Sequence, residues 1–307
     1  MGPDGCRRQL ISLQTEKDGA TPRGVVPSFL LYGLGLAPFL GLVVVFLVIP
    51  AIGVFVQAFH NPDGSFGFGS MRDAISGQNL DAFFFSFGFS FGSATVGSAF
   101  GLVVAYAISV TKRPRWVRGV AMSFSGVTAN MGGVLLAFAF LSLLGRQGVL
   151  TKVLGAFGWD LYAGDFNLGS TVGLIVVYSY FNIPLMVLVS LAAVENMKVT
   201  WREACANLGG NSTTYWWRIG LPVLSPSIIS GFLLLFANSF SAYATARALT
   251  DNSKIVPLRI GFFLSGDIKT GTDSLGYALA AWMIIVMAVC IALYWIARSR
   301  AERWQRA

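Results

Sequence analysis

Charged side chains are scarce in this 307-residue sequence, at 12% against 55% hydrophobic residues. Soluble globular domains carry about 25% charged residues, so the composition argues against one. Histidine occurs once, as His60, and the three cysteines, Cys6, Cys205 and Cys290, lie far apart. Because these residues lack metal-ligand spacing, we expect neither a metal site nor a disulfide framework. A membrane enzyme would need clustered His, Cys or carboxylates, and the sequence offers no such cluster.

Apolar runs dominate what is present, and six of them are long enough to cross a bilayer, which takes about 20 residues each. They cover Phe29–Phe59, Phe83–Val110, Gly119–Leu144, Thr171–Val194, Val223–Thr250 and Leu275–Ala297. We therefore expect an all-α, polytopic membrane protein with six transmembrane helices. A secondary transporter would need acidic side chains inside the membrane for ion coupling. The six runs contain none away from their ends, which disfavours that class.

Lys and Arg alternate in density between successive connecting segments. The richer segments hold Arg7, Arg8, Lys17, Arg23, Lys112, Arg113, Arg115, Arg118, Lys198, Arg202, Arg218, Arg298, Arg300, Arg303 and Arg306. The poorer ones hold Arg72, Arg146, Lys152, Lys254, Arg259 and Lys269. Basic loops stay in the cytoplasm, so both termini are predicted to be cytoplasmic. The net charge of +8 then faces the membrane surface, and we expect no nucleic acid partner.

The predicted organisation is a single membrane domain with short tails. Residues 1–28 are polar and predict a disordered cytoplasmic tail, and residues 29–59 predict an N-terminal transmembrane helix. This first run is too long for a signal peptide and lacks a clear cleavage site, so we expect none. Residues 83–297 form a five-helix core, and 298–307 a cytoplasmic tail. Two small-xxx-small pairs in the second run, at 88/92 and 97/101, are interpreted as helix packing.

The segment between the fourth and fifth runs, residues 195–222, predicts a short cytoplasmic helix. Thr200 and Glu203 have the spacing of a capping box, which predicts a helix start at Trp201. Gly209 and Gly210 predict its end. Ser212 is then a candidate cap for a second helix, which carries Trp216 and Trp217.

An apolar stripe on this short helix points to a partner. Its members recur at helical spacing and are Trp201, Ala204, Cys205 and Leu208. A helix of about eight residues is marginal alone and needs a surface on which to dock. We therefore expect a partner protein at this loop.

The same segment resembles the EAA loop of binding-protein-dependent ATP-binding-cassette importer permeases, whose pattern is E-A-A, three residues, G, nine residues, I-x-L-P. The residues in register with it are Glu203, Ala204, Gly209, Ile219, Leu221 and Pro222. Cys205 replaces the second alanine. Cysteine is small and weakly hydrophobic, so we expect docking to be retained. The resemblance extends from the second run to the end of the chain, and the first run is similar to the extra N-terminal helix of many members.

The resemblance implies a subunit of a larger transporter in the cell (inner) membrane and not an enzyme. The loop would be the coupling helix, seated on one of two ATPase subunits that carry ATP and Mg. The chain has no G-x-x-x-x-G-K-[ST] sequence and is expected to bind no cofactor itself. A second permease subunit, a related but different chain, and an external solute-binding protein would complete the importer.

Polar side chains within the fourth and fifth runs are candidates for the substrate path, because polar groups at this depth face a partner helix or an aqueous path. They are Tyr180, Asn182, Asn238, Ser239, Tyr243 and Arg247. Helix packing alone could account for about half of them. The stretch around Tyr243 is more similar to permeases for polyamines, ferric iron and phosphonates than to those for sugars. We take a polyamine or similar organic cation as the first expectation, with sugar, phosphonate and ferric iron as alternatives.

Overall fold

A computed structural model describes residues 28–61, 63–111, 115–164, 166–250, 254–265 and 273–306. Side chains are described in these ranges except at residues 28–35, 115, 117 and 300–306. Nearly all of the expected N-terminal tail therefore lies outside the described residues. Every regular element in the described part is helical, and the β-bridge between His60 and Phe66 is isolated. The all-α prediction is confirmed.

The chain divides into two compact units, Met1–Gly53 and Val54–Ala307. The described part of the first unit is an apolar helix. It consists of α2 (Ser28–Val43), the π-helical turn η1 (Val44–Val48) and the start of α3 (Ile49–Ala58). From Leu36 on, where side chains are described, most of its large apolar side chains are exposed, as expected of a helix surrounded by lipid.

In the described part of the chain, six helical segments are long and apolar enough to cross a membrane, as predicted. They are Leu36–Ala58, Gly77–Val110, Val134–Ala156, Thr171–Glu195, Ser212–Ser241 and Asp273–Ser299. The number agrees with the prediction, but the third segment is Val134–Ala156 and not the predicted run 119–144. The chain is therefore a multi-pass membrane protein.

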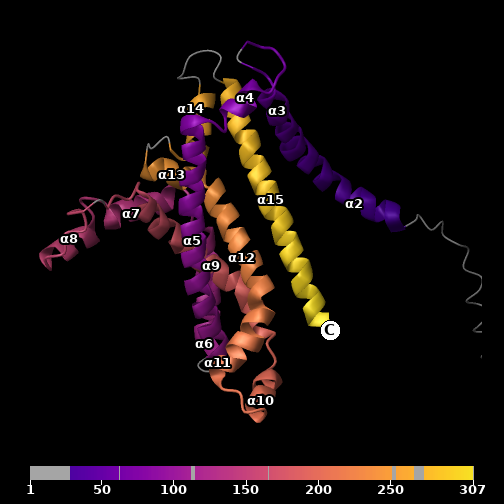
Figure 1. The fold of residues 1–307 in the computed structure, drawn as a ribbon, viewed down its shortest axis with the longest axis vertical. Coiled ribbons are helices and arrows are strands. Elements are labelled where there is room, and N and C mark those ends of the chain that lie inside the picture. The colour runs from indigo at the N-terminus through magenta and orange to yellow at the C-terminus, as the bar shows by residue number, and fades with distance from the viewer. Residues whose placement is uncertain are drawn as a thin grey trace, which may run out of the picture. The chain divides into compact units, whose positions relative to one another are not determined.

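The second unit is a helical bundle built around α9 (Thr171–Glu195) (Figure 1). α5 (Gly77–Val110) packs along both α9 and α12 (Leu221–Ser241). α6 (Arg115–Asn130) packs on α9. α15 (Asp273–Arg306) packs on α12 and continues as a helix through the predicted C-terminal tail.

One end of this bundle is covered by two short helices. α4 (Gly69–Asp73) and α14 (Val256–Leu264) both pack on the N-terminal part of α15. The indole Nε1–H of Trp282 donates to the carbonyl oxygen of Met71 at 3.0 Å, which fixes α4 on α15. The C-terminal end of α15 lies at the opposite end of the bundle (Figure 1).

Two of the predicted spans are broken, which corrects the expectation of continuous helices there. The run 119–144 divides into α6 and α7 (Val134–Leu144) around Gly133, whose φ is +78°. α8 (Val149–Ala156) follows α7. The run 223–250 divides at Ala242, where ψ is 99°, into α12 and α13 (Tyr243–Leu249).

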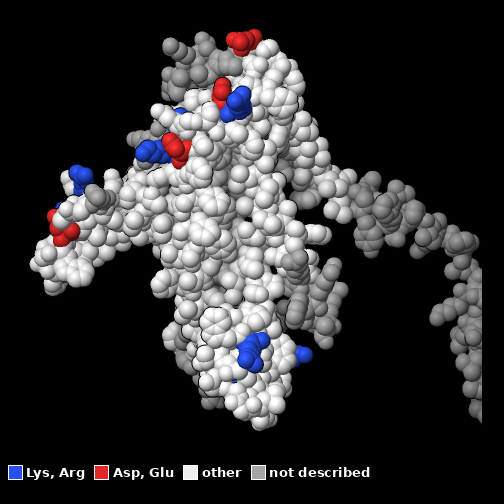
Figure 2. Space-filling view, in the orientation of Figure 1, with Lys and Arg blue, Asp and Glu red and all other residues white. Residues whose placement is uncertain are grey.

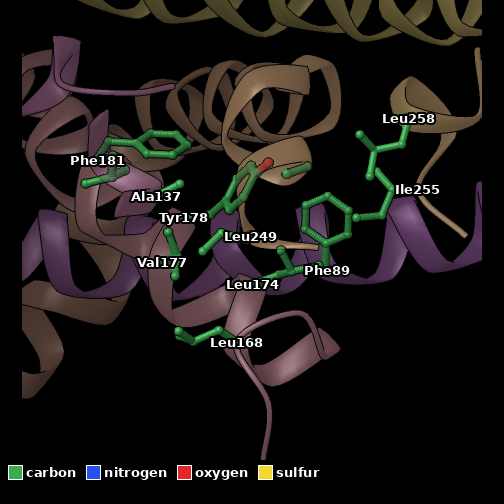
Figure 3. Close-up of a cluster of buried hydrophobic side chains, with 12 residues drawn as sticks. Phe89, Ala137, Leu168, Leu174, Val177, Tyr178, Phe181, Leu249, Ile255 and Leu258 are labelled. Atoms are coloured by element: carbon green, nitrogen blue, oxygen red, sulfur yellow. The ribbon is translucent and has the colours of Figure 1, made fainter. Parts of the chain in front are cut away.

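A buried aromatic cluster holds α7 and α13 against α9 (Figure 3). Tyr178 of α9 is its centre, with ring centroids 5.3 Å from Phe89 of α5 and 5.3 Å from Phe181. Ala137 of α7 and Leu249 of α13 belong to the same cluster and are buried. The two helix breaks are thus held side by side by one core.

Candidate functional site

Residues 196–220, which join α9 to α12, form a hairpin of short helices at the C-terminal end of α9 (Figure 1). We call this segment the α10 loop. It contains α10 (Val199–Asn207), α11 (Ser212–Tyr215) and the π-helical turn η2 (Trp216–Gly220), which leads directly into α12. The C-terminal end of α15 lies at the same end of the second unit (Figure 1).

The predicted start of this helix is wrong by two residues. α10 begins at Val199 after Lys198, so Thr200 lies inside the first turn and cannot be its N-cap. The first turn closes through the Trp201 amide, which donates to the Lys198 carbonyl at 3.2 Å. The Lys198 Nζ lies 5.9 Å from the centroid of the Trp201 ring, and this cation–π contact favours the earlier start.

The predicted end of the helix is confirmed. Gly209 has a φ of +77°, the left-handed conformation that glycine adopts without steric cost. Its amide donates to the Ala206 carbonyl, and the Gly210 amide donates to the Cys205 carbonyl, both at 2.9 Å. This pair of bonds is a Schellman motif, which satisfies the last carbonyls of the helix.

The second short helix is capped by Asn211, not by Ser212 as predicted. The Asn211 Oδ1 accepts from the amide and from the hydroxyl of Thr214, both at 2.8 Å. Asn is as good an N-cap as Ser, so the sequence carried this signal one position earlier.

The residues of the apolar stripe and of the EAA-like pattern are partly exposed and partly line a groove, and Ala204 and Leu208 do both. Glu203, Ala204 and Leu208 are exposed, and Leu208 reaches 89%. Cys205 is 8% exposed. The groove between α10 and α12, which we call the α10 groove, has a volume of about 520 Å³ and is mostly apolar. Its lining includes Trp201, Ala204, Cys205, Leu208, Ile219 and Val223, while Leu221 and Pro222 lie at the start of α12 outside it.

A second candidate site lies at the two helix breaks. We call it the break cavity: it has a volume of about 350 Å³, and its polar side chains are Asn130, Asn238, Tyr243 and Thr245. The Gly133 amide donates to the Thr245 hydroxyl at 2.9 Å, and the Tyr178 hydroxyl donates to the Ala242 carbonyl at 3.0 Å. These bonds satisfy backbone groups that the breaks would otherwise leave unpaired. Irregular backbone at membrane depth is tolerated where it is buried in protein or lines a water-filled cavity.

Only two of the six predicted path residues, Asn238 and Tyr243, line the break cavity. Asn182 and Ser239 are fully buried. The Asn182 Nδ2 donates to the Ser239 Oγ at 2.9 Å, and Ser93 donates to the same oxygen at 3.1 Å. The three residues therefore join α5, α9 and α12 by a polar contact between helices.

The remaining two predicted path residues lie against aromatic rings. Tyr180 packs edge-on against Phe140, with ring centroids 5.6 Å apart. The Arg247 Cζ lies 5.4 Å from the centroid of the Phe262 ring. Asp251, the carboxylate one turn after Arg247, lies outside the described residues.

Residues 81–306 match the family described as the inner membrane component of binding-protein-dependent transport systems. The match covers α5 to α15 and includes both candidate sites. The chain belongs to this family. The resemblance carried by the EAA-like pattern is thereby confirmed.

Several proteins similar to this chain are named as permeases for different solutes. The molybdenum transport system permease protein ModB of Mycobacterium tuberculosis is 25% identical over 161 residues, which are 52% of this chain and 57% of ModB. The sulfate transport system permease protein CysW of Synechococcus elongatus is 22% identical over 98% of this chain and 97% of its own length. The spermidine/putrescine transport system permease protein PotB of Haemophilus influenzae is 27% identical over 52% of this chain and 55% of PotB. The chain thus spans little more than half the length of two of these relatives.

Among solved structures, the fold is similar to a chain of a bacterial ABC transporter involved in the import of the acidic polysaccharide alginate. The TM-score is 0.64 at 19% identity, over 90% of this chain and 96% of that chain. A second structure of the alginate transporter, in complex with its pentasaccharide-bound periplasmic protein, matches with the same TM-score. At this identity the likeness supports the permease fold and not the substrate.

Ser239→Ala is expected to destabilise this permease component by about 1 kcal/mol, because the Asn182 Nδ2 loses its partner in the membrane interior and Ser93 loses one of its two bonds, the other being to the Ser90 carbonyl. The midpoint of thermal unfolding in detergent measures the change. Ser241→Ala is the matched control, since that exposed hydroxyl donates to the Asn238 carbonyl of its own helix, at 3.3 Å, and joins no second helix in the described part of the chain. A higher transport KM for Ser239→Ala with unchanged stability would instead place Ser239 on the substrate path.

Proposed function

We propose that the chain is the permease subunit of an ATP-driven importer and forms part of the path for a small polar solute. The α10 loop carries this proposal. It presents exposed apolar side chains, Val199 and Leu208, and an apolar groove at one end of the bundle. Such a surface suits a partner protein, and its residues fit the EAA-like pattern in register.

The partners follow from the same reasoning. Two ATPase subunits, which carry ATP and Mg, dock on the α10 loop of this chain and of a second, related permease. An external solute-binding protein delivers the solute at the end marked by α4 and α14. Both termini are cytoplasmic in this arrangement, and the protein resides in the cell (inner) membrane. On the face shown in Figure 2, the charged side chains near the α10 end are Lys and Arg.

We propose the break cavity as the part of the path that contacts the solute, with a polyamine or similar organic cation as first candidate. Tyr243 is 44% exposed and offers an aromatic face to an ammonium group, a contact worth about 0.5–2 kcal/mol. The similarity to PotB supports this candidate. A small oxyanion is the second candidate. The described lining of the cavity has two side-chain amides, Asn130 and Asn238, and no carboxylate to repel an anion. Ferric iron, phosphonate and sugar remain alternatives.

Tyr243→Ala is expected to lower solute uptake about tenfold while membrane yield and basal ATPase activity stay near normal, because it removes a cavity wall whose side chain is 44% exposed. Uptake of labelled spermidine, sulfate and molybdate by cells that carry the importer measures the effect and identifies the solute. Asn238→Ala is expected to act in the same direction.

Tyr243→Phe is the matched control, because it keeps the aromatic face and removes only the hydroxyl. For a polyamine it should transport nearly as well as the unmodified protein. Normal uptake by both Tyr243→Ala and Asn238→Ala would remove the break cavity from the path. Uptake unaffected by loss of the ATPase subunits would contradict the importer itself.

A further inference from the structure

A basic cleft opens beside the α10 loop, separate from the α10 groove. It has a volume of about 610 Å³ and is bounded by α5, α6, α9, α10 and η2. Its cationic side chains are Arg118, Lys198 and Arg202, and the described lining contains one carboxylate, Glu195. The Glu195 Oε1 is 2.7 Å from the Arg118 Nη2, so this ion pair satisfies the carboxylate. The charges of Lys198 and Arg202 therefore have no acidic partner in the described lining.

The floor of the cleft is apolar and continues into a second cavity. This α5–α12 groove has a volume of about 290 Å³ and an almost entirely apolar lining. Tyr106, Val194 and Trp216 line both cavities. The rings of Tyr106 and Trp216 meet edge to face at 5.1 Å and form the shared wall.

The groove leads away from α10 toward the middle of the bundle. Leu102 and Val103 lie one turn before Tyr106 on α5, and Leu221 and Leu224 lie on the first turn of α12. Val103 is 65% exposed, so the groove is open along one side. The two cavities together offer a basic mouth joined to an apolar channel along the helices.

We propose that this joined cavity binds one anionic phospholipid, with its phosphate between Lys198 and Arg202 and an acyl chain in the α5–α12 groove. Basic pockets between transmembrane helices on the cytoplasmic side bind anionic lipid headgroups. An inorganic phosphate would leave the apolar groove unused, and a neutral lipid would leave the two cations uncompensated. Because Lys198 is the N-cap of α10, the bound lipid would contact the start of the helix that couples to the ATPase. The location at the cytoplasmic surface rests on the proposed function.

Native mass spectrometry of the full importer complex in detergent tests this proposal. The complex is titrated with phosphatidylglycerol or with phosphatidylcholine of identical acyl chains, and the retained lipid is counted. We expect phosphatidylglycerol to be retained more strongly. Lys198→Gln and Arg202→Gln should each weaken its retention about fivefold, since a basic residue near an anionic lipid surface contributes about that factor. Both residues are exposed, so neither substitution should disturb the fold, and size-exclusion profiles measured in parallel check this.

Two further variants separate a lipid from other ligands. Val103→Trp should fill the open side of the groove and weaken phosphatidylglycerol retention without removing a charge. Lys152→Gln is the control for loss of one exposed positive charge: this lysine lies on α8 and lines neither cavity, so retention should not change.

Three results would overturn the proposal: equal retention of the two lipids, an unchanged affinity in Val103→Trp, or stabilisation of the complex by inorganic phosphate that is lost in Arg202→Gln. The last would assign the cleft to a free anion. None of these measurements depends on solute uptake, so failure here is distinguishable from failure of the importer assignment.

Discussion

Gly209→Val is expected to reduce solute uptake at least about tenfold and to reduce co-purification of the ATPase subunits to a similar degree. Gly209 has a φ of +77°, where a β-branched residue is strongly disfavoured, at a cost of about 1–3 kcal/mol. Relief of that strain would break the Schellman bonds from Gly209 and Gly210 and redirect the chain between α10 and α11. Each 1.4 kcal/mol lost from ATPase docking is a factor of about ten in affinity.

Two companion variants separate the shape of the loop from its contact surface. Gly209→Asn should retain most of the activity, because Asn tolerates the left-handed conformation. Glu203→Lys should also lose the ATPase subunits, but with the fold of the loop intact, since Glu203 is exposed. Normal assembly and transport in both Gly209→Val and Glu203→Lys would contradict a coupling role for the α10 loop.

The boundaries of α10 illustrate which local signals a sequence can carry. The helix end was predictable because a left-handed residue after a helix is nearly always glycine. The starts of α10 and α11 were not predictable, because several residue types can cap a helix and adjacent positions offer more than one candidate. Lys198 contacts the Trp201 ring, and the Asn211 side chain bonds to Thr214. By residue type alone, neither Lys198 nor Asn211 is a better N-cap than Thr200 or Ser212.

The helix breaks could not be predicted, and with them the break cavity. Apolar composition continues through Gly133 and Ala242, so composition and length predict a continuous helix in both runs. Tertiary contacts decide the breaks, through the bond between Gly133 and Thr245 and the bond from Tyr178 to Ala242. The number of spans was predictable because it depends only on the length and composition of each run.

Polarity alone selected the candidate path residues, and polarity has two uses inside a membrane protein. Asn238 and Tyr243 face the break cavity, whereas Asn182 and Ser239 bond to each other between helices. All four are polar residues in apolar runs, so their sequence positions do not separate the two uses. The separation requires the rotation of α9 and α12 about their axes, which close packing against α5 determines.

The close packing of α5 against α9 accounts for the second large expected effect, a loss of stability. Gly101→Leu is expected to destabilise the chain by about 3 kcal/mol or more and to reduce the folded yield severely. A Cβ on Gly101 would lie 2.5 Å from the Met186 Cβ and 2.8 Å from the Ile183 carbonyl oxygen, and backbone cannot move aside as a flexible side chain does. At Gly97, a Cβ would lie 2.6 Å from the Asn182 Cβ, so Gly97→Leu should have a similar effect.

Gly88→Leu is the matched control on the same helix. Gly88 belongs to the other small-xxx-small pair of α5, yet it is exposed and a Cβ there would meet no atom within 4 Å. Thermal unfolding and size-exclusion yield of the three leucine variants in detergent measure the difference. If Gly88→Leu is as damaging as Gly101→Leu, the glycines act through some property other than close approach of α5 to α9. If Gly88→Leu is tolerated, the small-xxx-small spacing alone does not determine stability. The loss of stability then depends on the contact that each glycine makes.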